Sequence, residues 1–214
     1  MHFLCLHGVG SNSRVFEQQT AALRYELGDN HTYDFVEGTV PWEPATEESN
    51  GETFAYGDMF QASSCLEVYQ DLRRYLEQEG PYDGVIGFSF GSGLALSILV
   101  DHYRCAASDA TPPFKLAVFF CNPRGPYDIN ALRQGHMEIL EPEQVERAIE
   151  IPTVHIWGSS DTDLDGGALG ERFCNSTNRS AYVHAKGHEI PTSAADTMAM
   201  ANVMRRAVVL AKGL

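Results

Sequence analysis

Short apolar runs recur along the chain, and most of them are continuous rather than alternating. Six of these runs are rich in β-branched or aromatic residues and end at turn signals. A strand covered on both faces has this continuous pattern, whereas a strand with one wet face alternates. The pattern therefore predicts a mainly parallel six-stranded sheet, with strands at residues 3–6, 33–36, 84–88, 115–121, 153–157 and 181–184.

Segments with helical spacing lie between these runs. Apolar residues repeat on one face in residues 13–27 and 66–79, and residues 94–100 are almost wholly apolar. Residues 192–212 are the longest candidate, with Thr192 or Ser193 as the cap and Gly213 as the stop. The alternation of strand and helix predicts one α/β domain over residues 1–214, with helices on both faces of the sheet.

Two connections are longer than a simple crossover requires. They span residues 38–64 and 122–151, and the second has a short helix predicted near 143–149. Long connections in compact domains tend to carry function, and both leave carboxyl ends of strands, where open α/β sheets bind ligands. We expect each to act as a lid or a substrate loop.

Charge and cysteine content narrow the functional classes. The formal net charge is −14, so a nucleic acid or an anionic membrane would be repelled, and no apolar run is long enough to span a bilayer. The first residues lack the basic leader of a signal peptide, and five dispersed cysteines without a C-x-x-C motif indicate reduced thiols. These features favour a cytoplasmic protein.

A candidate nucleophile, Ser89, lies in the pentapeptide GFSFG between Gly87 and Gly91. A serine at a sharp strand-to-helix turn has a strained backbone, and flanking side chains would collide there. The pentapeptide follows the strand predicted at 84–88 and precedes the helix predicted at 94–100, which is the setting that a nucleophilic serine needs.

A serine hydroxyl needs a base, and the base needs an orienting acid. In α/β-hydrolases these follow in the order serine, acid, histidine. The strand at 153–157 leads into Asp161, and the strand at 181–184 leads into His188, so both fall at the sheet edge that holds Ser89. Asp163 and Asp165 are alternative acids, whereas His155 and His184 lie within strands and are interpreted as packing residues.

An oxyanion hole would need two backbone N–H donors. Phe90 follows the nucleophile at the start of a helix, and Val9 lies in the loop after the first strand, so their amides are the candidates. His7 in that loop is interpreted as structural. The glycines of the same loop also approximate a dinucleotide-binding motif, so a dinucleotide-binding oxidoreductase is an alternative. In that case Gly8 and Gly10 would lie at the phosphates and Glu37 would contact a ribose. A noncatalytic binding protein is the third alternative.

Four ordered segments carry a resemblance to a known family. The chain resembles the FSH family of serine hydrolases, small α/β-hydrolases common in fungi and related to the human ovarian-cancer-associated hydrolase, in LHGVGSNSRVFEQQTAAL, GPYDGVIGFSFGSGLA, IPTVHIWGSSD and HAKGHEIP. The resemblance implies an α/β-hydrolase fold and places nucleophile, acid and base on Ser89, Asp161 and His188. It also implies a carboxylic ester or thioester substrate and, for some relatives, release of acyl chains from the carrier domain of a polyketide synthase.

Substrate contacts are expected mainly from apolar side chains near these loops, and no motif indicates a metal or another cofactor. Aromatic residues beneath the long loop could form an acyl pocket, with Phe54, Tyr56, Phe60 and Phe90 as further members. The substrate-binding candidates are Trp42, Phe88 and Cys121.

Overall fold

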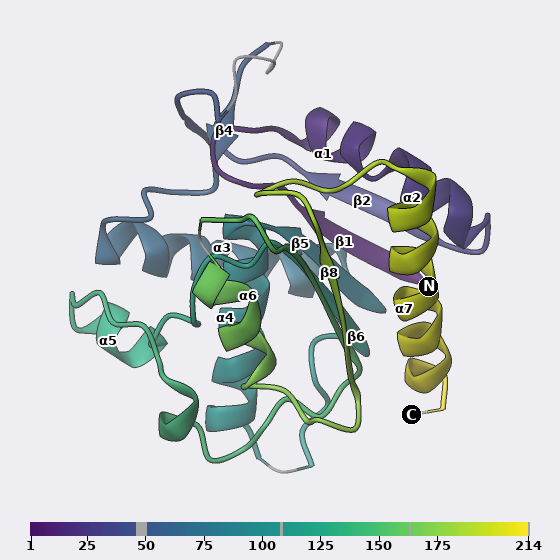
Figure 1. Ribbon diagram of the computed structural model, residues 1–214. Helices are drawn as coiled ribbons and strands as arrows, with labels where there is room; N and C mark the ends of the chain where they lie inside the picture. Colours follow the sequence, from purple (N-terminus) through teal and green to yellow (C-terminus); the bar gives the residue numbers. More distant parts are fainter. Residues whose placement is uncertain (46–50, 108, 163, 214) are drawn as a thin grey trace.

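The computed structural model describes residues 1–45, 51–107, 109–162 and 164–213, except the side chains of residues 164–166. Its centre is a sheet in the order β2-β1-β5-β6-β7-β8, with all neighbouring strands parallel (Figure 1). All six predicted strands are confirmed within two residues of their predicted bounds. They are β1 (His2–Leu6), β2 (Thr32–Val36), β5 (Gly84–Phe88), β6 (Leu116–Phe120), β7 (Thr153–Gly158) and β8 (Arg179–His184).

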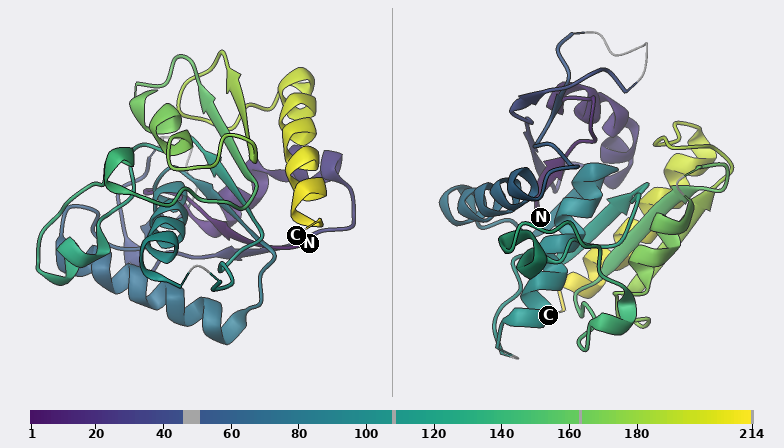
Figure 2. Two further views of the ribbon diagram at one scale, coloured as in Figure 1. Left: turned by 90° about the horizontal axis from the view of Figure 1, so that it is seen from below. Right: turned by 90° about the vertical axis from the view of Figure 1, so that its left-hand side faces the viewer.

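Helices cover both faces of this sheet (Figures 1 and 2). Because successive side chains of a strand point to opposite faces, Leu4 and Leu6 pack into one core while Phe3 and Cys5 pack into the other. The first core lies under α3 (Ala62–Glu79), α4 (Phe90–Cys105), α5 (Ile129–Arg133) and α6 (Leu164–Glu171), and the second under α1 (Ser13–Gln19), α2 (Ala21–Leu27) and α7 (Ala194–Ala211).

Two predicted helices differ from the observed ones. The helix predicted over residues 13–27 is divided at Thr20, whose hydroxyl donates to the Phe16 carbonyl at 2.9 Å. Such back-bonding by threonine bends a helix. The helix predicted near 143–149 is only a 3₁₀ turn at Pro142–Gln144, and the Ile149 amide instead donates to the Phe173 carbonyl at 2.8 Å.

The segment after β2 is fastened to the loop after β1. It contains the short antiparallel pair β3 (Val40–Pro41) and β4 (Phe54–Ala55), which periodicity did not predict because each strand has two residues. The Gly10 amide donates to the Phe54 carbonyl at 3.0 Å, and the Ala45 amide donates to the Gly10 carbonyl at 2.9 Å. Among the described residues, no helix has the length and hydrophobicity that a membrane crossing requires.

The strand order places two loops next to each other. The chain moves outward from β1 to β2 and then returns to the other side of β1 to form β5. The carboxyl ends of β1 and β5 therefore lie at the point where the direction of winding reverses. Open α/β sheets have a crevice at this point.

Candidate active site

Ser89 joins β5 to α4 with a backbone that side-chain-bearing residues seldom adopt. Its φ is 52° and its ψ is −117°, and its amide donates to the Phe120 carbonyl of β6 at 2.9 Å. The turn closes because Gly87 and Gly91 have no side chains. A β-carbon on Gly87 would lie 2.5 Å from the Ser92 nitrogen, and one on Gly91 would lie 2.2 Å from the Leu6 carbonyl oxygen.

Ser89, His188 and Asp161 form one chain of hydrogen bonds. Nε2 of His188 lies 2.9 Å from the Ser89 Oγ, and Nδ1 lies 2.8 Å from Oδ2 of Asp161. An ionised carboxylate only accepts, so Nδ1 carries the proton of a neutral ring and Nε2 accepts from the serine hydroxyl. This is the tautomer in which a histidine can take the proton of a serine.

The loops that carry the acid and the histidine are held together by backbone hydrogen bonds. The Ser159 amide donates to the His184 carbonyl at 2.7 Å, and the Ser160 amide donates to the Lys186 carbonyl at 3.0 Å. The Asp161 amide donates back to the Gly158 carbonyl at 3.1 Å. The positions of the two side chains are therefore fixed by neighbouring strands, β7 and β8.

Asp161 and His188 differ in how far they are buried. Asp161 is 3% exposed, whereas the His188 side chain is 32% exposed. The buried carboxylate therefore lies behind the ring, and the ring faces the solvent side where a substrate could approach. Of the alternative acids, Asp163 and the side chain of Asp165 lie outside the described residues.

The other two histidines of β7 and β8 are packing residues, as predicted. His155 is 1% exposed, and His184 is also buried. Burial lowers the pKa of His155 to about 3 and lowers the pKa of His184. His184 accepts a hydrogen bond from the Lys186 amide at 3.3 Å and so lies beneath the loop that carries His188.

The loop after β1 lies against the first turn of α4. A β-carbon on Gly91 would meet the carbonyl oxygens of both Leu6 and His7. Phe90 is the first residue of α4, where backbone N–H groups have no partner within the helix. The predicted donors, the amides of Val9 and Phe90, thus belong to two segments in close contact.

His7 holds this loop through its ring. Nδ1 lies 2.7 Å from the Gly8 carbonyl and therefore donates to it, while Nε2 accepts from the Gly38 amide at 2.9 Å. Burial lowers the pKa of His7, which favours this neutral form. The Tyr56 hydroxyl accepts from the His7 amide at 2.9 Å. The contact of Tyr56 could not be predicted from the sequence, because Tyr56 lies 49 positions after His7 and no local pattern connects them.

Glu37 occupies a different position from that expected of a ribose-binding acid. Its carboxylate accepts from the Ser13 amide at 2.9 Å and from the Ser13 hydroxyl at 2.8 Å. It also lies 3.2 Å from Nε2 of His7. The two hydrogen bonds from Ser13 fix the start of α1, so they give Glu37 a structural explanation that needs no dinucleotide.

The substrate-binding candidates are only partly brought together. Phe88 packs in the core under α1, α2 and α7, and its ring centroid lies 5.3 Å from that of His188. Phe90 packs in the opposite core, so the two aromatic neighbours of Ser89 point to opposite faces of the sheet. Phe60 is exposed, and Trp42 is half-buried beside β4, where its amide donates to the Thr53 carbonyl at 2.9 Å.

Cys121 lies beneath Asp161 and His188 rather than on an open wall. It is 1% exposed, has a φ of 46°, and its thiol donates to the Glu189 carbonyl at 3.5 Å. Ligand atoms of Cys121, Asp161 and His188 lie within 4.8 Å of one another. A metal bound there through one nitrogen of His188 would replace the hydrogen bond that this nitrogen makes, and burial raises the pKa of the Cys121 thiol to about 12. The cluster therefore suits proton transfer better than metal binding.

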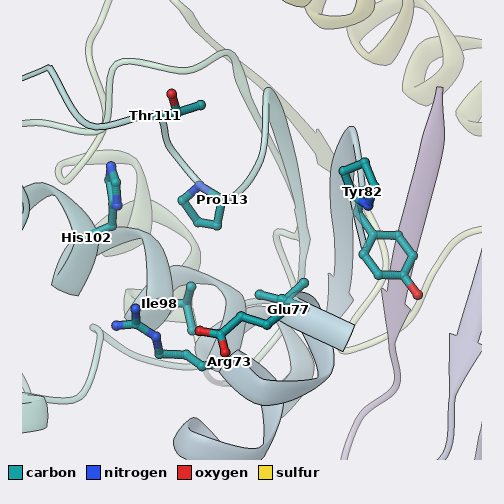
Figure 3. A pocket seen from close by; sticks show the side chains of 9 residues that line it. Arg73, Glu77, Tyr82, Ile98, His102, Thr111 and Pro113 are labelled. Atoms are coloured by element: carbon teal, nitrogen blue, oxygen red, sulfur yellow. The ribbon is translucent and has the colours of Figure 1, made fainter. Parts of the chain in front are cut away.

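A hollow of about 320 Å³ lies at the opposite end of the sheet (Figure 3). Pro81 and Pro113, which precede β5 and β6, form part of its wall together with Arg73, Glu77 and His102. Because these prolines precede the strands, the hollow opens at the amino ends, far from Ser89. It is therefore separate from the candidate active site.

Comparisons with known proteins identify the family of this chain. A family model described as serine hydrolase (FSH1) matches residues 1–200. Esterase FPY3 of Fusarium mangiferae is 38% identical over an alignment of 221 positions, which covers 98% of this chain and 99% of FPY3. Hydrolase phiM of a fungal species is 34% identical over 194 residues, which cover 89% of this chain and 86% of phiM.

The fold also matches solved structures. SOBER1 of Arabidopsis thaliana superposes with a TM-score of 0.61 at 15% identity, covering 97% of this chain and 99% of SOBER1. A carboxylesterase from Mesorhizobium loti gives a TM-score of 0.61 at 14% identity, covering 97% of this chain and 88% of that protein. The α/β-hydrolase fold predicted from the sequence is confirmed, and with the family model spanning residues 1–200 the chain belongs to the FSH1 family of serine hydrolases.

Proposed function

We propose that this serine hydrolase cleaves a carboxylic ester or thioester through an acyl-serine intermediate on Ser89. The observation that carries the proposal is the continuous chain from the Ser89 Oγ to Nε2 of His188 and from Nδ1 to Asp161, with distances of 2.9 and 2.8 Å. His188 takes the hydroxyl proton as Oγ attacks the acyl carbonyl. Asp161 holds the ring and stabilises the imidazolium that forms.

The amides of Val9 and Phe90 stabilise the oxyanion of the tetrahedral intermediate. Support comes from the contact between the loop after β1 and the first turn of α4, and from the two hydrogen bonds by which the His7 ring holds that loop. When the intermediate collapses, His188 gives its proton to the leaving alcohol or thiol. Water then attacks the acyl-serine, with His188 again as base, and the acid is released.

An ester is the substrate class with the most direct support, because FPY3, which matches this chain over nearly its whole length, is named an esterase. A thioester fits the same groups, since a thiolate leaves with little help from a proton. An acyl-carrier domain as partner stays a prediction from the family resemblance, and a lid or substrate-loop role for residues 38–64 and 122–151 stays a prediction from the length of these connections. A cytoplasmic location also stays a prediction.

Substrate class can be tested with matched acyl donors. We expect the purified chain to hydrolyse p-nitrophenyl esters and the corresponding N-acetylcysteamine thioesters, with kcat/KM higher for butyryl to octanoyl groups than for acetyl. Release of p-nitrophenol and of free thiol would be followed spectroscopically, with the Ser89→Ala variant as blank. Equal release by wild type and Ser89→Ala would overturn the acyl-serine mechanism, and reaction of acetyl donors alone would overturn the preference for apolar acyl groups.

A further inference from the structure

A second hollow lies behind the loop after β1, between the edge strand β2 and helix α3. Its volume is about 180 Å³. Leu6, Val68, Leu72 and Leu94 form its buried walls, and the half-buried Val36 completes them. Ser89 and His188 do not line it, so it is distinct from the candidate active site.

The walls of this cavity are connected to the oxyanion loop. Leu6 directly precedes His7, and the Tyr56 hydroxyl, which accepts from the His7 amide, donates to the Val36 carbonyl at 3.0 Å. Tyr56 itself lines the cavity. An occupant would therefore pack against two residues, Leu6 and Tyr56, that adjoin or hold the loop carrying Val9.

The mouth of the cavity is polar and acidic. Glu37, Thr39 and Asp71 are exposed there, and no lysine or arginine is among the lining residues. Arg74 pairs with Asp71 from the surface of α3 at 3.0 Å, but its side chain is 61% exposed and lies outside the cavity. With a net charge of −14 on the whole chain, this mouth favours a neutral or cationic head group and disfavours a carboxylate.

The size of the cavity limits the apolar part of an occupant. A dry protein cavity of about 150 Å³ accepts benzene, which has six carbons. We propose that the cavity binds an aliphatic chain of about six carbons that ends in a hydrogen-bond donor, either an alcohol or a primary amine. The chain fills the space between Val36, Leu72 and Leu94, and the head group lies at the carboxylates of Glu37 and Asp71.

Binding can be located by NMR on the full chain with labelled leucine and valine methyl groups. On titration with hexanol or hexylamine, we expect shifts at Leu6, Val36, Val68, Leu72 and Leu94. Affinity should rise about fourfold for each methylene from butanol to hexanol, as burial of one CH₂ predicts, and stop rising beyond heptanol. Hexanoate should bind about tenfold more weakly than hexylamine. Equal or tighter binding of hexanoate, or shifts confined to other methyl groups, would overturn the proposal.

A pair of matched variants separates this site from general surface binding. Val36→Phe puts a larger side chain into the cavity, whereas Val183→Phe makes the same change on β8, the opposite edge of the sheet. We expect Val36→Phe to weaken hexanol binding at least tenfold and Val183→Phe to leave it within twofold. If Val36→Phe does not fold, Val36→Ala serves as a second variant: it removes two methyl groups from the wall and should extend the chain-length limit by about two carbons. Unchanged binding in a folded Val36→Phe variant, or an equal loss in Val183→Phe, would contradict the assignment.

Discussion

The two ends of the sheet carry similar side chains in different arrangements. At the carboxyl end, a serine, a histidine and an aspartate from the ends of β5, β8 and β7 meet at hydrogen-bond distances. At the amino end, Arg73, Glu77 and His102 line a hollow of about 320 Å³ (Figure 3), yet His102 hydrogen-bonds the backbone of Ala110 rather than an acid. A hollow with polar walls is therefore weaker evidence for an active site than polar side chains that converge from separate strands.

Backbone strain separates the two ends in the same way. Among the described residues other than glycine, the positive φ values belong to Ser89 and Cys121, which directly follow the neighbouring strands β5 and β6. Such conformations cost free energy and persist where the surroundings hold them. Strain and converging polar groups thus coincide at the carboxyl end. The comparison predicts that substitutions at this end affect catalysis much more than equivalent substitutions at the other.

The largest expected effect is the loss of the nucleophile. Ser89→Ala and His188→Ala should each lower kcat for a p-nitrophenyl ester by about 10⁶-fold, because these groups act as one unit. His102→Ala, a matched change at the amino end, should leave kcat within twofold. Circular dichroism would verify folding of all three variants. A large loss in His102→Ala would erase the distinction between the two ends.

Removal of the orienting charge should cost less. We expect Asp161→Asn to lower kcat by about 10⁴-fold, because an amide does not hold His188 in the required tautomer. Glu77→Gln makes the same chemical change beside the other hollow and should leave kcat unchanged. The measurement is steady-state ester hydrolysis across pH. Full activity in Asp161→Asn would mean that another acid orients His188.

Close packing at the turn can be tested with two neighbouring glycines. A β-carbon on Gly91 would lie 2.2 Å from the Leu6 oxygen, whereas one on Gly93 meets only the Asn122 Oδ1 at 3.8 Å. We expect Gly91→Ala to lower the free energy of unfolding by about 3 kcal/mol. Gly93→Ala should change it by less than about 1 kcal/mol, with helix propensity favouring alanine. Urea denaturation would measure both, and a similar stability for the two variants would refute the proposed close contact.

The smallest effect concerns a buried histidine away from the chemistry. The pKa of His155 is about 3 in the folded chain, against an ordinary value of 6.5. Below pH 6.5 the unfolded chain therefore binds a proton that the folded chain does not, so stability is lost as the pH falls. From pH 7 to pH 5 this should cost about 2 kcal/mol. In urea denaturation, His155→Leu should remove about that much of the pH dependence of the free energy of unfolding. The pH dependence that remains should come from His7 and His184, whose pKa values are also lowered. An unchanged pH dependence would argue against burial as the cause.

The sequence predicted the sheet, and the meeting of Ser89, Asp161 and His188 at one of its edges, for a physical reason. Strands covered on both faces have continuous apolar runs, so the strands could be located. Ser89, Asp161 and His188 come shortly after such runs, so all three could be placed at the edge formed by the carboxyl ends of the strands. The break at Thr20 was missed because a threonine that bonds back to a carbonyl has the same polarity in a continuous helix. The tie between Tyr56 and His7 was missed because it joins distant segments. Phe88 and Phe90 were grouped by proximity in sequence, although they point to opposite faces.

Covalent labelling with a fluorophosphonate probe tests the central claim most directly. After reaction with the folded chain, peptides would be mapped by mass spectrometry, with the His188→Gln variant in parallel. The account predicts one adduct, on the Ser89 Oγ, and labelling at least a thousandfold slower in His188→Gln, because a serine hydroxyl without its base is a poor nucleophile. Absence of an adduct on Ser89 in the folded chain, or labelling at the same rate without His188, would contradict it.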